Sequence, residues 1–249
     1  MNRFSNFKFL IIVVFLLTLI ACEKGALFNA GEAVSREVLL QDKISTIEVN
    51  TMSDITLVQD TVNKAIVTCG ANLQPNIDLF VKEDILHINN SIRYGWSRSY
   101  EKIKLELHLI SIPTLNIRVP VYITTRDTFK TESFFLVDWG MFTELDVTLN
   151  VNNFGLDVSS EGFGHYTVKG KSVNATFNDW GSSFFYADGF KVQNCLVKQR
   201  SIGDIYINVS NNLTVSIETT GRVFYYGNPS TIVLKNNFSK ELLIHLPKK

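Results

Sequence analysis

The sequence predicts an all-β protein built as a β-solenoid, and three observations support this fold class. Apolar and polar residues alternate along most of the chain after residue 32, as in strands with one buried face. No window of about 11 or more residues beyond the N-terminal apolar run keeps a helical spacing. Glycines recur in the second half with a period of about 20 residues, which is typical of stacked coils.

Five segments of the second half share one pattern, in which two inward-type residues two positions apart are followed by glycine four positions later. The segments are Phe134/Leu136/Gly140, Leu156/Val158/Gly162, Ala175/Phe177/Gly181, Val197/Gln199/Gly203 and Val215/Ile217/Gly221. We expect each glycine at a tight corner, where a β-carbon would meet the neighbouring coil or the backbone needs positive φ. Apart from Asp188-Gly189, the hairpin dipeptides that would favour a β-sandwich are missing.

The N-terminus predicts export and a lipid anchor. Arg3 and Lys8 precede an apolar run from Phe9 to Leu19, which is short for a bilayer span and typical of a signal peptide. The run ends in Leu19-Ile20-Ala21-Cys22, which resembles the bacterial lipobox. We therefore expect cleavage after residue 21 and lipidation of Cys22, which would hold the protein to a membrane surface. The alternative is an ordinary secretory signal with a chance cysteine.

The rest of the chain is predicted to form a tether followed by one domain. Residues 22–32 are small or polar and predict a flexible tether. Residues 33–249 form the domain, with a strand-rich opening region of about 33–118 and coils over about 119–249. Without residues 1–21 the chain has 22 basic and 24 acidic residues. This near-neutral charge gives no electrostatic footprint for nucleic acid.

Residues that could carry catalysis or bind metal are sparse. The four histidines, His87, His108, His165 and His245, have no metal-ligand spacing, and no nucleophile elbow or phosphate-binding glycine loop occurs. We therefore expect no cofactor, no metal and no enzymatic activity. Cys69 and Cys195 lie in apolar, strand-like surroundings that favour buried free thiols, and a bridge between them stays open.

Four segments of the mature chain occur in an order that one bacterial family shares. They are residues 44–59, 77–88, 104–119 and 203–229. Together they resemble the auto-transporter adhesin head GIN domain of bacterial lipoproteins. The resemblance implies a right-handed β-helix exported on a lipid anchor, a proposed role in adhesion and no assigned catalytic residues. We accordingly expect attachment to the outer membrane, on its periplasmic or its cell-surface face.

The predicted corners carry aromatic residues where relatives have small Ser-Gly corners. The corner segments are Asp138-Trp139-Gly140, Glu161-Gly162-Phe163-Gly164 and Asp179-Trp180-Gly181. Because stacked strands lie ~4.8 Å apart, we expect Trp139, Phe163 and Trp180 to form an exposed aromatic column. Asp138 and Asp179 would add hydrogen-bond acceptors, and rings beside carboxylates suit sugar ligands. The alternative is that the rings cover the hydrophobic interior.

A second candidate site is the loop Arg93-Tyr94-Gly95-Trp96-Ser97-Arg98-Ser99-Tyr100. Tyr, Trp and Arg are enriched in binding hot spots, which makes Arg93, Trp96 and Arg98 candidate ligand contacts. The alternative is a long connection whose aromatic residues fold back onto the sheet. We expect a binding module that contacts a glycan or a partner protein. The alternative function is a polysaccharide-active β-helix enzyme using the corner aspartates Asp138, Asp157 and Asp179.

Overall fold

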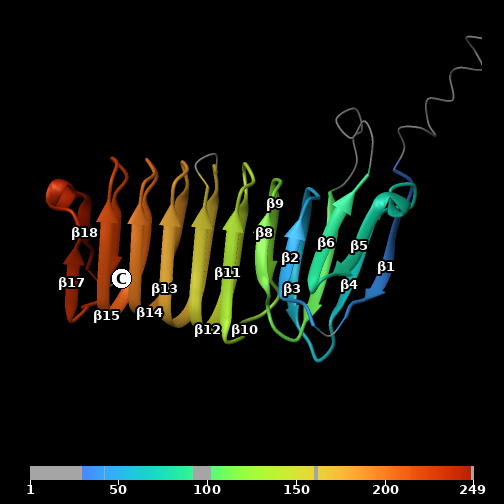
Figure 1. The fold of residues 1–249 in the computed structure, drawn as a ribbon, viewed down its shortest axis with the longest axis horizontal. Helices are drawn as coiled ribbons and strands as arrows, with labels where there is room; N and C mark the ends of the chain where they lie inside the picture. The colour runs from blue at the N-terminus through green and yellow to red at the C-terminus, as the bar shows by residue number, and fades with distance from the viewer. Residues whose placement is uncertain (1–29, 42, 92–101, 160–161, 248–249) are drawn as a thin grey trace, which may run out of the picture.

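The computed structural model describes residues 30–247, except for 42, 92–101 and 160–161. The described chain winds into an elongated β-solenoid of about six turns (Figure 1). No α-helix occurs among these residues, and none of them forms a helix that could span a bilayer. The predicted all-β solenoid is therefore confirmed.

The described residues form 18 strands and two short 3₁₀ helices. The opening strands and first helix are β1 (Ala33–Leu39), β2 (Thr46–Val49), β3 (Ser53–Gln59), β4 (Lys64–Gly70), η1 (Gln74–Asn76), β5 (Ile77–Lys82), β6 (Ile85–Asn90), β7 (Ile103–Leu109), β8 (Thr114–Ile117) and β9 (Val121–Thr125). The later elements are β10 (Phe129–Lys130), β11 (Ser133–Asp138), β12 (Glu144–Val158), β13 (His165–Asp179), β14 (Phe184–Gln199), β15 (Ile205–Ile217), β16 (Val223–Tyr226), β17 (Thr231–Leu234), η3 (Asn237–Leu242) and β18 (Leu243–His245).

Strand pairing arranges these elements into two sheets that enclose the core. Sheet 1 runs through β5, β6, β2, β8, β11, the second halves of β12 to β15, and β17. Sheet 2 runs through β1, β4, β7, β3, β9, the first halves of β12 to β15, β16 and β18. Each long strand bends from sheet 2 into sheet 1. The chain then returns to sheet 2 through a turn that we call the upper corner.

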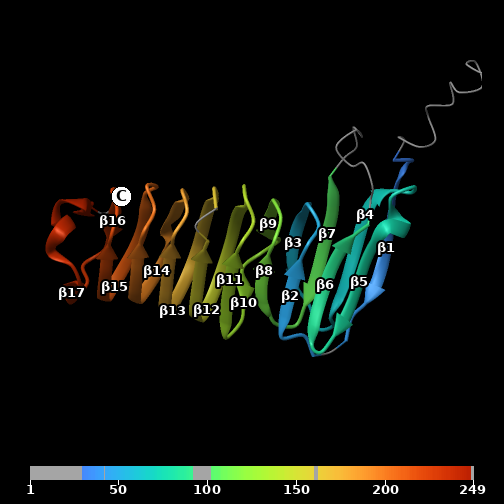
Figure 2. The ribbon, with the colours of Figure 1, turned by 45° about the horizontal axis from the view of Figure 1, so that its top comes forward.

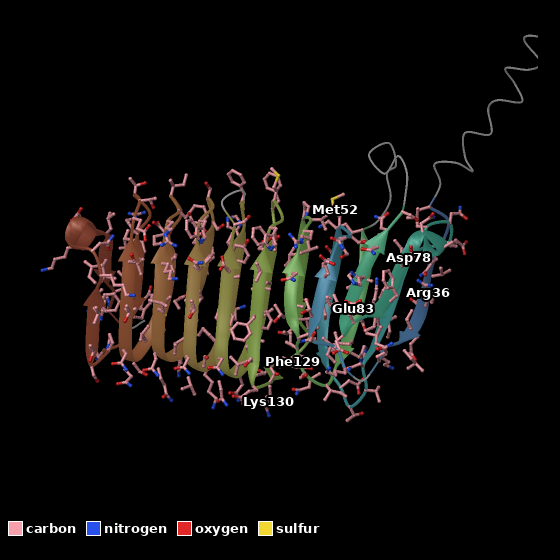
Figure 3. The ribbon with its side chains drawn as sticks, viewed as in Figure 1. Arg36, Met52, Asp78, Glu83, Phe129 and Lys130 are labelled. Atoms are coloured by element: carbon pink, nitrogen blue, oxygen red, sulfur yellow. The ribbon has the colours of Figure 1, made fainter. Side chains whose placement is uncertain are left out.

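In each coil, the upper corner begins with the residue that follows the last inward side chain of sheet 1. These first residues are Arg118, Trp139, Ser159, Trp180, Arg200 and Glu218. The turns of this corner lie at the top of Figure 1. Met52, between β2 and β3, lies at the same edge of the molecule, whereas Phe129 and Lys130 lie at the opposite edge (Figure 3).

The strands of the opening region stack in an order that differs from their order in the sequence. The coil of β2 and β3 pairs in parallel with β6 and β7 on one side and with β8 and β9 on the other. Both views show this early coil between strands that come later in the sequence (Figures 1 and 2). Strands β1, β4 and β5 add antiparallel pairs at the N-terminal end.

The structure confirms the repeat period and corrects its phase. One inward column contains Leu136, Leu156, Phe177, Val197 and Val215 in register. The five predicted segments form four successive pairs, and three of these pairs are out of register by two residues. The reason is that the corners between the segments differ in length. Side chains alternate with period two, so a two-residue offset leaves each one on the same face of its sheet. The inward residues were predicted correctly for this reason.

The five predicted corner glycines, Gly140, Gly162, Gly181, Gly203 and Gly221, are needed for close approach rather than for positive φ. A β-carbon on Gly203 would lie 1.7 Å from the carbonyl oxygen of Ser183 in the preceding coil. One on Gly181 would lie 2.3 Å from the carbonyl oxygen of Gly162. Backbone atoms cannot yield at such distances without moving the coil.

Apolar side chains fill the space between the sheets. Phe134 and Phe154 stack with ring centroids 5.6 Å apart, and the ring of Phe154 also contacts Phe177 at 5.3 Å. Cys69 and Cys195 are buried free thiols, so the bridge that the sequence left open does not form. Packing and the hydrogen-bonded ladder hold the described solenoid together without a disulfide.

We predict that Gly203→Ala lowers the free energy of unfolding by about 3 kcal/mol or more, because the new methyl group meets the Ser183 carbonyl. Gly189→Ala is the matched control. Its β-carbon would first meet the flexible Lys169 side chain at 3.3 Å, so we expect a change within about 0.5 kcal/mol. Urea unfolding measures both values, and equal effects would contradict the assigned register.

Candidate ligand-binding face

The first residues of the upper corner form an outward column. The amide of Trp139 donates to the carbonyl of Ile117 at 2.9 Å, and the amide of Trp180 donates to the carbonyl of Val158 at 3.1 Å. The amide of Ser159 donates in the same way to Asp138. Trp139 and Trp180 therefore lie two coils apart with Ser159 between them, at a separation of roughly 9.6 Å.

Both tryptophans of this column are accessible to solvent. Trp139 is 52% exposed and Trp180 is 45% exposed. Neither ring is enclosed in the core, and about half of each remains available to a ligand. The side chains of this edge project beyond the ends of the strands (Figure 3).

An arginine covers one face of each indole. The guanidinium carbon of Arg118 lies 5.4 Å from the ring centroid of Trp139, and that of Arg200 lies 4.0 Å from the centroid of Trp180. Arg118 belongs to the coil before Trp139, whereas Arg200 belongs to the coil after Trp180. Each arginine thus covers one face of its indole, and the two tryptophans lie in one outward column with Ser159 between them.

Phe163 does not belong to the column that the sequence predicted. Its ring stacks on Phe142, with centroids 5.8 Å apart and planes inclined by 22°. The corner after Val158 is longer than the corner after Asp179, which carries Phe163 past Ser159 toward sheet 2. The expected column of three rings is therefore corrected to two tryptophans separated by a serine.

Asp138 and Asp179 do not provide acceptors beside the indoles, contrary to the prediction. Both side chains are fully buried, because each aspartate precedes an outward tryptophan and successive side chains on a strand point to opposite faces. Asp138 accepts hydrogen bonds from the Gly140 amide at 2.7 Å and from the Tyr166 hydroxyl at 2.6 Å. Asp179 accepts one from the Gly181 amide at 3.1 Å.

The geometry also bears on the enzyme alternative. Asp157, the third aspartate of that hypothesis, points outward from sheet 1 and accepts a hydrogen bond from the Asn178 amide group at 2.9 Å. Asp138 and Asp179 point inward, so the three carboxylates do not converge on one open pocket. Among the described residues, no group of three His, Cys, Asp or Glu side chains could hold a metal ion.

Burial sets the electrostatics of the inward aspartates. It raises the pKa of Asp179 to about 6, although the Ser201 hydroxyl, the Gly181 amide and the Ser183 hydroxyl partly offset this effect. The Oδ2 atom of Asp179 has no donor in hydrogen-bonding geometry. Burial likewise raises the pKa of Asp138, which the Tyr166 hydroxyl opposes.

An aromatic band that the sequence reasoning missed covers the outer surface of sheet 2. Tyr186 stacks on Tyr206 at 5.7 Å, and Tyr206 stacks on Phe224 at 4.7 Å. In the adjacent outward column the ring of His165 contacts Phe184 at 5.6 Å. The available signal was aromatic residues at outward strand positions one period apart. It becomes visible only once the register of the coils is known.

Two hollows lie where this band meets the upper corner. One of about 330 Å³ is bordered by Met52, Tyr122 and Phe142, and one of about 290 Å³ is bordered by Phe142, Phe163 and Phe184. Phe142 and Glu144 border both hollows. The predicted contacts Arg93, Trp96 and Arg98, and the predicted lipidation site Cys22, lie outside the described residues.

We predict that the stability of the protein falls as the pH rises from about 4 to about 7. The pKa of Asp179 is about 6 in the folded state and about 3.9 in an unfolded chain. The resulting stabilisation is complete below the unfolded pKa and is lost as the pH rises through the folded pKa. Asp179→Asn should remove this loss and be up to about 3 kcal/mol more stable than wild type near pH 7.5.

Urea unfolding between pH 4 and pH 8 tests this expectation. The wild type and Asp179→Asn should converge near pH 4, and Asp127→Asn, which changes an exposed turn residue, should keep the wild-type profile. A variant that is less stable than wild type at every pH would show that the ionised Asp179 is stabilising.

Comparisons with known proteins identify a family and a shared fold. Residues 44–229 match the family described as "Putative auto-transporter adhesin, head GIN domain". No curated protein matches the chain. A crystal structure of a "putative adhesin" from Bacteroides fragilis is similar, with a TM-score of 0.72 and 16% identity over 82% of this chain and 92% of that one.

Two proteins from Parabacteroides distasonis are also similar in structure. One, described as a "putative adhesin", has a TM-score of 0.62 and 17% identity, covering 88% of this chain and 98% of its own. The other, described as a "Putative lipid binding protein", has a TM-score of 0.56 and 18% identity with the same coverage. At these identities the structural likeness shows a shared fold. The family match spans most of the sequence, and the chain therefore belongs to the auto-transporter adhesin head GIN domain family.

Proposed function

We propose that this protein is a lipid-anchored adhesin-like module of the bacterial envelope that binds glycans through Trp139 and Trp180. Membership of an adhesin family supports an adhesin-like role and a location in the envelope or outside the cell. The two tryptophans supply an exposed aromatic surface for a ligand. No reaction is part of this proposal, because the aspartates that could have supplied an acid and a base are buried or lie apart.

The observation that carries the proposal is the pair of half-exposed indoles two coils apart in one outward column, with Ser159 between them. A ring held midway between them would lie roughly 4.8 Å from each indole. This distance falls within the range of about 4.5–7 Å over which stacked rings attract one another. A sugar ring presents axial C–H groups on its faces, so it can contact both indoles at once.

Polar groups next to the indoles suit a hydroxylated ligand. Ser159 lies between the two rings in the outward column and can both donate and accept hydrogen bonds. The guanidinium of Arg200 donates to Glu218 at 2.7 Å, which holds it against one face of Trp180. The indole of Trp180 is therefore backed by an arginine that is itself held in place.

The proposal of a lipid anchor is based on the sequence of residues 1–22. The basic start, the apolar run and Leu19-Ile20-Ala21-Cys22 support cleavage before Cys22 and its lipidation, with attachment to the outer membrane. Metabolic labelling with a fatty acid should mark the wild type and not a Cys22→Ser variant. Equal labelling of the two would refute the anchor.

We predict that Trp139→Ala and Trp180→Ala each weaken glycan binding about tenfold, since each removes one of two stacking faces. The melting temperature should change little, because both rings are about half exposed. A glycan array identifies a binding sugar, and isothermal titration calorimetry with that sugar then measures each variant. Phe135→Ala, which removes an outward ring of sheet 1 that is 43% exposed, is the matched control and should bind normally.

Two results would refute the role of the tryptophans. Either variant could unfold at a much lower temperature than Phe135→Ala, which would mean that the indoles act in packing. Alternatively, both variants could bind the sugar as tightly as the wild type, which would place the site elsewhere.

A further inference from the structure

Glu144 is an exposed carboxylate that no described residue neutralises. It begins β12 on the outer surface of sheet 2, and it forms no ion pair or hydrogen bond with any described residue. Other outward carboxylates of this sheet are neutralised. Asp146 pairs with Lys169 at 2.9 Å, and Asp204 pairs with Arg222 at 2.7 Å.

Aromatic residues occupy the neighbouring outward positions on both sides of Glu144. The register places Glu144 directly between Tyr122 of β9 and His165 of β13. The imidazole of His165 packs against Phe184 at 5.6 Å and makes no ion pair with Glu144. On the corner side, the stacked rings of Phe142 and Phe163 continue the same aromatic surface.

The two hollows beside Phe142 give a ligand access to these groups. The smaller one, of about 290 Å³, is bordered by three phenylalanines together with His165 and Glu144. The larger one, of about 330 Å³, adds Tyr122 and Lys102. Lys102 pairs with Asp54 at 3.3 Å, so its ammonium group does not neutralise Glu144.

Charge and aromatic character together select the chemistry of a ligand. A neutral apolar group in the smaller hollow would desolvate Glu144 without giving it a hydrogen bond or a counter-charge, which is unfavourable. A cation compensates the carboxylate and is also attracted to the negative faces of aromatic rings within about 6 Å. An alkylated ammonium group satisfies both requirements and places its methyl or methylene groups against the rings.

We propose that the hollows around Phe142 and Glu144 form a binding site for organic ammonium groups. The ligand class is a small organic cation, of which choline, glucosamine and lysine amide are examples that share this chemistry. The site is separate from the pair of indoles at Trp139 and Trp180. The test of this site is therefore independent of whether those tryptophans bind a glycan.

Choline and its neutral isostere 3,3-dimethylbutanol test the proposal directly. Nuclear magnetic resonance titration of the mature protein should show saturable shifts of the Phe142, Phe163 and Phe184 rings with choline. The Kd for the isostere should be about tenfold higher or more, because it lacks the charge. Parallel titrations with glucosamine and lysine amide show which source of the ammonium group binds best.

Glu144→Gln should weaken choline binding about tenfold, while Asp127→Asn leaves the Kd unchanged. Both Glu144 and Asp127 are exposed, so the dispersion of the amide spectrum should confirm that each variant is folded. Three results would overturn the proposal. They are no saturable shift with any of the three cations, equal affinity for choline and its isostere, or an unchanged Kd in Glu144→Gln.

Discussion

The ladder of backbone hydrogen bonds between successive coils determines the rest of this structure. In β12 to β14 each coil repeats the strand positions of the coil before it, so equivalent residues stack in columns along the solenoid. A single ladder position fixes whether a side chain enters the core or faces solvent. The neighbours Asp138 and Trp139 show the consequence, because one is fully buried and the other is 52% exposed.

The same ladder explains why polar groups occur inside the upper corner. Where the chain leaves sheet 1, corner amides lose their strand partners and need acceptors, because buried polar groups are almost always hydrogen-bonded. Asp138 and Asp179 accept from the amides of Gly140 and Gly181, and the side chain of Gln199 accepts from the amide of Ser201. These residues stabilise the turn from within, which leaves the outer side of the corner free to carry aromatic rings.

The features set by local patterns could be predicted from the sequence. Alternation gave the inward residues, and glycine spacing gave the repeat, because both reflect constraints within one coil. Corner length could not be predicted. Because the phase of the repeat and the position of Phe163 depend on corner length, both were predicted wrongly. The insertion of β2 and β3 between later coils was also missed, since any coil with the same alternation can stack at that position. Glu144 and the aromatic band of sheet 2 became visible only when the register brought distant residues together.

Iodide quenching of tryptophan fluorescence tests the central claim, that the register turns Asp138 and Asp179 inward and both neighbouring indoles outward. A Trp96→Phe variant leaves Trp139 and Trp180 as the only fluorophores of this type in the chain. The structure predicts red-shifted emission and efficient quenching of both, because each indole is about half exposed. Blue-shifted emission that resists iodide would mean that the indoles occupy the core and that the register at the upper corner is wrong.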